Sequence, residues 1–250
     1  MIDRDHAQLR VAADLAILTV REGTLQALVI TRGNKPFVGQ PALPGGFVRT
    51  DEDIDAAAAR ELHEETGLVG SDLHLEQFAV YGDPDRDPRG RVVSVAYLAI
   101  MPDLPIPTAG SDASSAAWVP VDKVRGGLAF DHDRILDDAV EQARRRLELT
   151  TLATAFCPAE FTIGDLHSVY EVVWGESLDP RNFSRKVMNT EGFVEPTDTK
   201  RIPATGRPAA LYRAGPATTL KPPIMRTRAD PETRTAVPAP PRGAGTGIRP

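Results

Sequence analysis

GGFVRTDEDIDAAAARELHEETGL, residues 45–68, is the stretch around which the rest of the chain is organised. It begins with two glycines, passes through an acidic turn and continues as a predicted helix. That helix should end at Gly67, because glycine readily adopts the left-handed conformation that follows a helix. Glu61, Glu64 and Glu65 are spaced at i, i+3 and i+4, so their side chains gather on one side. The stretch therefore predicts a helix that presents three carboxylates together.

These carboxylates continue the apolar side of the helix. Ile54 and Ala58 define an apolar stripe at roughly 100° per residue, which further residues of the helix extend. Glu61 and Glu65 lie on that stripe, although like charges at i and i+4 disfavour a helix by roughly 0.2–0.5 kcal/mol. A divalent cation such as Mg²⁺ would relieve the repulsion, since hard cations prefer carboxylate oxygens. The alternative interpretation is a surface helix that tolerates a few repelling acids.

The stretch also carries specific residues at specific spacings. They are Gly46, Glu52 after five residues, Arg60-Glu61-Leu62 after seven more, then Glu64-Glu65 and Gly67-Leu68. This pattern resembles the signature of the Nudix hydrolases, with every defined position filled. The resemblance implies an α/β/α sandwich, placed at residues 8–148, that acts on a nucleoside diphosphate linked to a further group X.

The same resemblance implies roles for individual residues. By position, Glu61 corresponds to the general base and to a metal ligand. Glu64, Glu65 and the carbonyl of Gly45 correspond to further metal ligands. Arg60 would orient the carboxylates, and its i, i+4 spacing also allows it to pair with Glu64. The implied metal is Mg²⁺ or Mn²⁺, which activates a water while a carboxylate removes its proton.

Composition and charge indicate a globular protein with two unlike parts. Of the 250 residues, 41% are apolar and 26% are charged. Residues 1–150 carry 16 Lys and Arg against 25 Asp and Glu, a net charge of −9. Residues 151–250 carry 13 against 10, a net charge of +3. An acidic first part and a basic second part predict two domains with different partners.

The first residues, the apolar runs and the cysteine content do not indicate a secreted or membrane protein. The first residues, MIDRDHAQLR, lack the apolar core of a signal peptide, and no run approaches the roughly 18 apolar residues that span a membrane. The single cysteine, Cys157, excludes an intramolecular disulfide and fits a reducing compartment. We interpret Cys157 as a small buried hydrophobic residue and expect a cytoplasmic protein without membrane partners.

Apolar runs on both sides of the signature predict a sheet. Two runs at 11–20 and 25–31 flank the turn Arg21-Glu22-Gly23-Thr24, which indicates a hairpin. Further strands are predicted at 73–81, 91–101 and 118–121. A helix capped by Asp131 or Asp133 should follow and reach Leu147, because its apolar residues recur at helical spacing.

The polar segment 82–91, GDPDRDPRGR, lies between two of these strands. Its composition is that of an ordinary turn-rich connection. The functional alternative is that Arg86, Arg89 and Arg91 offer planar donors to a pyrophosphate or a carboxylate. The segment resembles the loop of Nudix proteins that handle ADP-ribose, in which a proline such as Pro84 lies 16 residues after the signature.

The second part of the chain predicts a winged helix-turn-helix over residues 156–214. Thr162 and Asp165 have the spacing of a capping box for a helix that reaches Trp174. Asp179 and Pro180 then suit the first positions of a second helix. Strands predicted at 193–202 and 209–213 would form the wing.

The second helix of such a domain enters the major groove of DNA. Residues 181–228 carry 10 Lys and Arg against 3 Asp and Glu, and arginine and asparagine pair bidentately with guanine and adenine. A winged helix that binds protein or forms a dimer is the alternative. The candidate DNA-binding residues are Arg181, Asn182, Arg185, Lys186, Asn189 and Arg207.

LDPRNFSRKVMN and GRPAALYRA, in residues 178–189 and 206–214, resemble the Nudix-related transcriptional regulators of NAD metabolism. This resemblance covers about residues 8–214. It implies a homodimeric repressor of NAD-biosynthesis genes that ADP-ribose releases from operator DNA. The complete Nudix signature leaves a second interpretation open, an active Mg²⁺-dependent ADP-ribose pyrophosphatase, and a third in which the protein does both.

The last segment, residues 215–250, contains 8 prolines in 36 residues and few large apolar side chains. This composition predicts a Pro-rich disordered tail. Its arginines could add nonspecific affinity for DNA, but a passive tail is the favoured interpretation.

Overall fold

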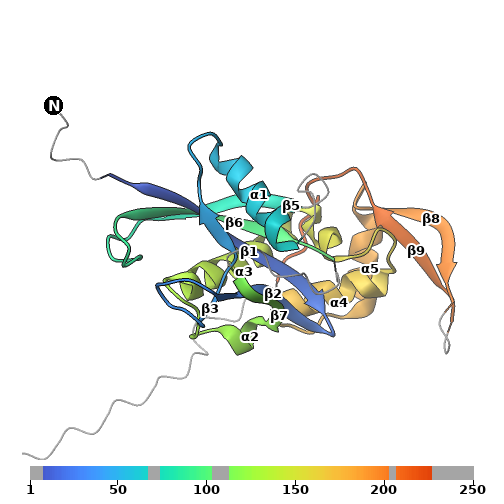
Figure 1. Ribbon diagram of the computed structural model, residues 1–250. Helices are drawn as coiled ribbons and strands as arrows, with labels where there is room; N and C mark the ends of the chain where they lie inside the picture. Colours follow the sequence, from blue (N-terminus) through green and yellow to red (C-terminus); the bar gives the residue numbers. More distant parts are fainter. Residues whose placement is uncertain (1–7, 67–73, 103–112, 203–206, 227–250) are drawn as a thin grey trace, which may run out of the picture.

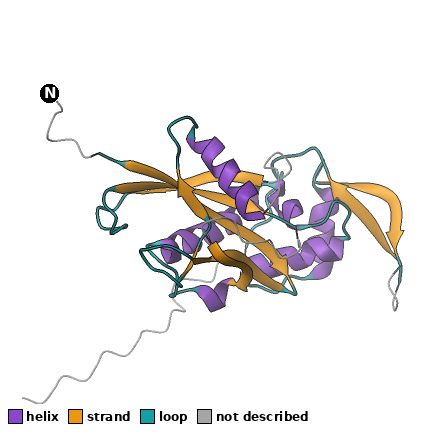
Figure 2. Ribbon diagram, viewed as in Figure 1, coloured by secondary structure: helices purple, strands orange, loops and turns teal. Residues whose placement is uncertain are grey.

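The computed structural model describes residues 8–66, 74–102, 113–202 and 207–226. A seven-stranded sheet with helices on both faces is followed by helices and a separate hairpin (Figures 1 and 2). The elements are β1 (Arg10–Arg21), β2 (Thr24–Arg32), β3 (Pro41–Ala42), β4 (Gly45–Phe47), α1 (Ile54–Thr66), β5 (His74–Tyr81), β6 (Val92–Ile100), β7 (Ala113–Pro120), α2 (Val121–Val124), α3 (His132–Leu149), the 3₁₀ helix η2 (Thr151–Phe156), α4 (Ile163–Trp174), α5 (Pro180–Asn189), β8 (Val194–Arg201) and β9 (Ala209–Ala214). No helix in the described ranges is long and apolar enough to cross a membrane.

The large sheet contains the predicted hairpin. β1 and β2 pair antiparallel, and Glu22 and Gly23 between them have φ of 50° and 70°, as a tight turn requires. The strands lie in the order β3-β2-β1-β6-β5, with β4 also paired to β1 and β7 to β2. β1 and β6 run parallel. The strand predicted at 118–121 belongs to the longer β7, because that strand pairs with β2 along most of its length.

The sheet is covered on both faces, so the predicted α/β/α sandwich is confirmed. Along β1, Leu15 and Ile17 pack in the core that contains α1. Ala16 and Leu18, which point to the other face, pack in the core that contains α3 and α4. Figure 2 shows α1 on one side of the sheet and the other long helices on the opposite side.

The buried side of α1 begins one turn later than the sequence predicts. Ala57, Ala58 and Leu62 are fully buried against the sheet, and Glu61 lies between them with 8% of its surface exposed. Ile54, which we expected in the same stripe, is 36% exposed. Ile54 is the first residue of the helix and precedes the turn that contacts the sheet. Its side chain is therefore not buried, although it lies on the same side of the helix as Ala58.

The helix boundaries predicted for the winged helix are confirmed. The Thr162 hydroxyl accepts from the amide of Asp165, and the Asp165 carboxylate accepts from the amide of Thr162, which completes the capping box. Gly175 ends α4 with φ of 72°. Asp179 caps α5 through its carboxylate, and Pro180 occupies the first position of that helix.

Helix α3 belongs to the cores of both parts of the chain. The Tyr170 hydroxyl donates to the Leu147 carbonyl at 3.0 Å, and the Trp174 indole donates to the Arg144 carbonyl at 3.2 Å. The Arg144 guanidinium donates in return to the Val173 carbonyl at 2.8 Å. Because a single apolar cluster extends from the sheet through α3 to α4 and α5, the winged helix is packed against the Nudix-like part.

The beginning of the predicted disordered tail is ordered. Residues 215–226 fold back along α3, with only 4% of Leu220 and 3% of Ile224 exposed. Their amides donate to the carbonyls of the last two residues of α3 at 2.8 Å and 3.0 Å. The prediction of disorder was wrong here because proline content does not reveal that two apolar side chains fit a core formed by distant residues. Residues 227–250 lie outside the described residues.

Candidate functional site

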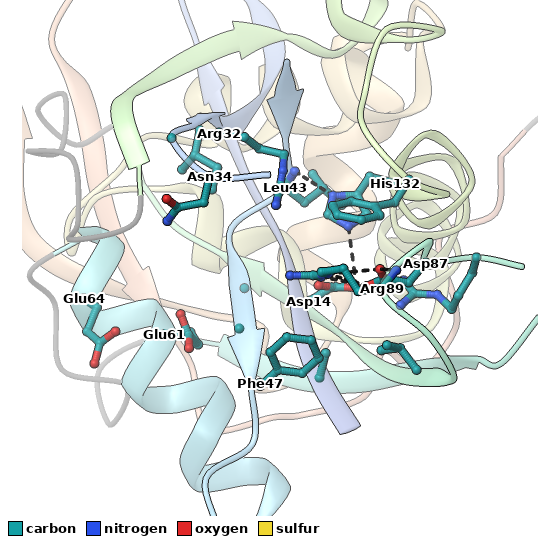
Figure 3. Close-up of a pocket in the computed structure, with 18 of the residues that line it drawn as sticks. Asp14, Arg32, Asn34, Leu43, Phe47, Glu61, Glu64, Asp87, Arg89 and His132 are labelled. Atoms are coloured by element: carbon teal, nitrogen blue, oxygen red, sulfur yellow. Dashed lines mark hydrogen bonds and ion pairs between the residues drawn. The ribbon is translucent and has the colours of Figure 1, made fainter. Parts of the chain in front are cut away.

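A cavity of about 370 Å³ lies between β4, α1, the loop after β2, the loop after β5 and the start of α3. Figure 3 shows Glu61 and Glu64 of α1 on one side of it. Asp87, Arg89 and His132 lie on the other side. The cavity therefore has a carboxylate wall and a facing wall that contains a guanidinium group.

Two glycines allow β4 to lie close to both β1 and Glu61 of α1 at the cavity. A β-carbon on Gly46 would lie 2.1 Å from Oε1 of Glu61. Gly45 has φ of 150°, and a β-carbon there would lie 2.4 Å from the carbonyl oxygen of Ala13. The paired glycines of the signature are therefore needed for the close fit of the strand against β1 and the Glu61 carboxylate.

Arg60 connects the acidic turn to the carboxylates of α1. It donates to both oxygens of Glu52 at 2.7 Å and 3.0 Å and to Glu61 at 2.6 Å. The expected bond to Glu64 is present but longer, at 3.4 Å. Hydrogen bonding to Arg60 lowers the pKa of Glu52 to about 2. Burial raises the pKa of Glu61, and its hydrogen bond with Arg60 opposes that increase.

The carboxylate wall offers oxygen ligands of the kind that a hard divalent cation prefers. Glu61 and Glu64 supply carboxylate oxygens to the cavity, and Gly45 also lines it. Among the described side chains, no three carboxylate, imidazole or thiol groups converge closely enough to hold a metal ion. The backbone of Glu65 is part of α1, but the side chain of this predicted ligand lies outside the described part of the chain.

The structure separates the three arginines predicted to bind the ligand. Arg86 lines the cavity but is only 8% exposed, and its guanidinium contacts Asp14 at 3.1 Å and Asp131 at 2.7 Å. Arg91 does not line the cavity and donates to the Gly82 carbonyl at 2.7 Å. Arg86 therefore builds the wall through buried ion pairs, while Arg91 ties together the two ends of its own loop.

Arg89 is the arginine of this loop that reaches the cavity with a partly exposed side chain. Its guanidinium donates to Oδ1 of Asp87 at 3.0 Å and to Oδ2 at 2.7 Å, which holds it in place. It also lies 4.8 Å from the ring centre of Phe47 and 5.2 Å from that of Phe130. The sequence prediction missed both aromatic rings, because nothing in their spacing relates them to the loop.

Phe130, which lines the cavity, and Phe37, which packs against Phe130, have unusual backbone conformations. Phe130 has φ of 58° and Phe37 has φ of 65°, values that are rare for bulky residues. Their rings meet edge to face at 4.8 Å. Strained conformations of this kind concentrate at ligand sites. No local pattern in the sequence indicates them.

A buried polar network forms part of the cavity wall, and the sequence prediction also missed it. Asp14 accepts hydrogen bonds from Ser94 and Arg86, and His132 lies 3.7 Å away. The amide of Leu43 donates to Nδ1 of His132 at 3.0 Å, and burial lowers the pKa of this imidazole. The available signal was the single aspartate inside the apolar strand VAADLAILTV.

The second candidate site is the exposed side of α5. Phe183 and Val187 face the core, whereas the predicted contact residues on the helix are exposed. The Arg185 guanidinium donates to the side-chain oxygen of Asn182 at 3.0 Å, which orients two of them together. The exposed set comprises Arg181, Asn182, Arg185, Lys186 and Asn189, with Arg207 exposed before β9.

Two protein families match separate parts of the chain. Residues 9–139 match the family model of the NUDIX domain. Residues 153–214 match that of the NrtR DNA-binding winged helix domain. The second match contains α4, α5, β8 and β9.

Known relatives share one or both parts. The chain is 36% identical to the ADPR responsive transcriptional repressor NtrR of Acinetobacter baylyi, over 84% of this chain and 83% of that protein. It is 40% identical to the ADP-ribose pyrophosphatase of Methanocaldococcus jannaschii, over 50% of this chain and 71% of that enzyme. The crystal structure of Shewanella oneidensis NrtR complexed with a 27mer DNA superimposes with a TM-score of 0.72 and 30% identity, covering 82% of this chain and 94% of the other.

Proposed function

Since the chain belongs to the Nudix family and carries a winged helix of the NrtR type, we propose that it is a transcriptional repressor of NAD-biosynthesis genes. Its Nudix domain binds ADP-ribose, and this ligand releases the protein from operator DNA. One observation carries the proposal. A cavity with carboxylate and guanidinium groups and a helix that exposes arginine and asparagine side chains occur on one chain with a continuous core.

DNA binding is assigned to α5 and the wing. Arg185 and Asn182 are exposed and mutually oriented, and both side-chain types form bidentate contacts with base edges. Lys186 and Arg207 are exposed, and we assign them to phosphates, which contribute affinity without sequence preference. We further propose a homodimer, because two recognition helices related by symmetry match the two half-sites of a palindromic operator.

Binding of ADP-ribose is assigned to the cavity. A volume of about 370 Å³ lies in the range of small-molecule sites, which is roughly 300–1,000 Å³. Arg89 supplies a planar donor toward the pyrophosphate, and the rings of Phe47 and Phe130 beside it offer stacking surfaces to a base. Arg86 contributes indirectly, because its two ion pairs hold the wall in shape.

The carboxylates supply the metal-binding function. Glu61 and Glu64, with Glu65 and the Gly45 carbonyl, would hold Mg²⁺ or Mn²⁺. The cation would neutralise phosphate oxygens and lower the pKa of a bound water. Arg60 keeps the carboxylates oriented through its bonds to Glu61 and Glu64.

Hydrolysis is the second candidate function, because the Glu52–Arg60–Glu61 network is complete. In this reaction a water oxygen bonds to one phosphorus of the pyrophosphate and the bridging P–O bond breaks. Glu61 would take the proton of the water, since its carboxylate lines the cavity and is oriented by Arg60. The products are AMP and ribose 5-phosphate.

Two assays test these functions separately. Fluorescence anisotropy on duplexes from upstream of NAD-biosynthesis genes should show specific binding that ADP-ribose weakens. Incubation with ADP-ribose and Mg²⁺ should release AMP if the domain is also an enzyme, and Glu61→Gln should abolish that release. Absence of specific DNA binding on any of these duplexes would overturn the repressor assignment, whatever the enzyme assay shows.

A further inference from the structure

Residues 215–226, the strap, continue from the wing and return to the rest of the molecule. The amides of Gly215 and Ala217 donate to the carbonyls of Phe193 and Gly192, each at 2.9 Å. A β-carbon on Gly215 would lie 2.2 Å from the Gly192 oxygen, so only glycine permits this contact. The first residues of the strap are therefore bonded to the segment that precedes β8, at the base of the wing.

The middle of the strap crosses the connection between α3 and the winged helix. The Thr151 hydroxyl donates to the Ala217 carbonyl at 2.8 Å, and Thr219 forms a β-bridge with Thr150. Leu220 and Ile224 are buried in the core shared by α3 and α4. These contacts join the wing, the connecting segment and the end of α3.

The strap's last described residue, Arg226, bridges two carboxylates of α3. Its guanidinium donates to Glu141 at 2.8 Å and to Glu148 at 2.9 Å. Glu148 is only 6% exposed, so loss of Arg226 would leave a buried carboxylate without its cation. Such a charge is relieved when the surrounding segment opens to water. Arg226 thus holds the strap closed.

The opposite end of α3 lies at the ligand cavity. His132, the first residue of α3, lines the cavity, and the preceding Asp131 pairs with Arg86 in the cavity wall. The helix has 18 residues and is therefore about 27 Å long. One rigid element extends from the cavity to the residues that hold Trp174 and the strap.

From this arrangement we infer that the strap positions the winged helix on α3, and that Arg226 sets how strongly ligand binding changes DNA affinity. The inference rests on the proposed function. With the strap closed, a shift of α3 moves the recognition helix with it. With the strap open, the winged helix is held by the packing of α4 on α3 and by the connecting segment, without the strap, and part of that shift is lost.

The test measures DNA affinity by anisotropy with and without saturating α,β-methylene ADP-ribose, an analogue that pyrophosphate cleavage cannot consume. In the wild type the two dissociation constants should differ by about 5- to 150-fold. In Arg226→Ala this ratio should fall to about twofold or less, while the analogue's own affinity for the DNA-free protein stays within about twofold of wild type. A purely structural role would lower the melting temperature without changing the ratio among folded molecules.

Arg145→Ala is the matched control, because it removes another arginine that pairs with Glu141 and leaves Arg226 in place. It should retain the wild-type ratio. Arg226→Lys, which keeps the charge but loses the bridging guanidinium, should give an intermediate ratio and serves if Arg226→Ala does not fold. A wild-type ratio in both Arg226 variants would overturn the inference alone. A ratio of one in the wild type would overturn the proposed regulation and the inference together.

Discussion

Arg60 donates hydrogen bonds to both carboxylate oxygens of Glu52, eight residues before it, from Nη2 at 2.7 Å and from Nε at 3.0 Å. Both side chains are largely shielded from solvent. This bidentate geometry fixes the acidic turn to the middle of α1 and leaves one guanidinium nitrogen for Glu61. The signature residues at positions 52 and 60 therefore act together to shape the loop before the cavity.

Glu52→Gln should change the pH dependence of stability. Because hydrogen bonding to Arg60 lowers the folded-state pKa of Glu52 to about 2 from 4.5, its contribution to stability is present above pH 4.5. That contribution is lost as the pH falls from 4.5 toward 2. Urea unfolding at pH 7 should show the wild type more stable than the variant, and the difference should shrink at pH 3. An equal difference at both pH values would contradict the ion pair.

Gly46→Ala should disable the carboxylate wall without unfolding the protein. The new methyl group would overlap Glu61 Oε1 at 2.1 Å, so the carboxylate must move out of its position. We expect ADP-ribose affinity measured with Mg²⁺ by calorimetry to fall at least tenfold, about 1.4 kcal/mol. Gly127→Ala is the control, since its β-carbon would meet nothing closer than 3.5 Å. Equal affinity of both variants would show that Glu61 is not needed for binding.

The features that sequence predicted well depend on short separations along the chain. The capping box of Thr162 and Asp165 and the cap by Asp179 each involve residues within a turn of one another. The approach of Gly46 to Glu61 is implied by the signature because loop and helix are adjacent. Local chemistry determines such contacts, so a pattern of residues is enough to predict them.

The failures involve residues far apart in sequence. Arg86 has the composition of a ligand contact in its loop, but Asp14 and Asp131, 72 and 45 residues away, bury its guanidinium. The Pro-rich composition of the strap predicts disorder, because composition does not reveal that Arg226 pairs with Glu141, 85 residues away. Only the folded sheet and α3 bring these charges together. The catalytic, metal-binding and DNA-contacting roles of individual residues stay predictions.

His132→Asn should remove one source of acid sensitivity. Burial holds the pKa of His132 below its usual 6.5, so the folded protein stays unprotonated there while the unfolded chain takes up a proton. Stability should therefore fall as the pH drops below 6.5, by up to about 1.4 kcal/mol per pH unit, until the folded-state pKa is reached. In the variant an amide oxygen can accept the Leu43 amide in place of Nδ1.

The measurement is urea unfolding at pH 7.5 and pH 5.5 for both proteins. The wild type should lose more stability than His132→Asn between these values. His74, whose pKa burial also lowers, contributes equally to both and cancels from the comparison. Identical losses would mean that His132 is accessible to protons in the folded state.

Arg185→Ala tests whether α5 reads DNA. Arg185 is exposed on the side of the helix opposite Phe183 and Val187, and its bond to Asn182 orients it. If it contacts a guanine, its loss should weaken binding to the preferred duplex by roughly 1–3 kcal/mol and relax the choice of base at one position. If it contacts phosphate instead, affinity should fall similarly on all duplexes, and the slope of log K against log salt concentration should become shallower by about one.

Arg145→Ala is the control, because it removes the same charge from α3. Arg145 pairs with Glu141 and is not among the predicted DNA contacts, so DNA affinity at fixed salt should stay unchanged. An Arg185→Ala protein that binds every duplex like the wild type would exclude α5 as the recognition helix.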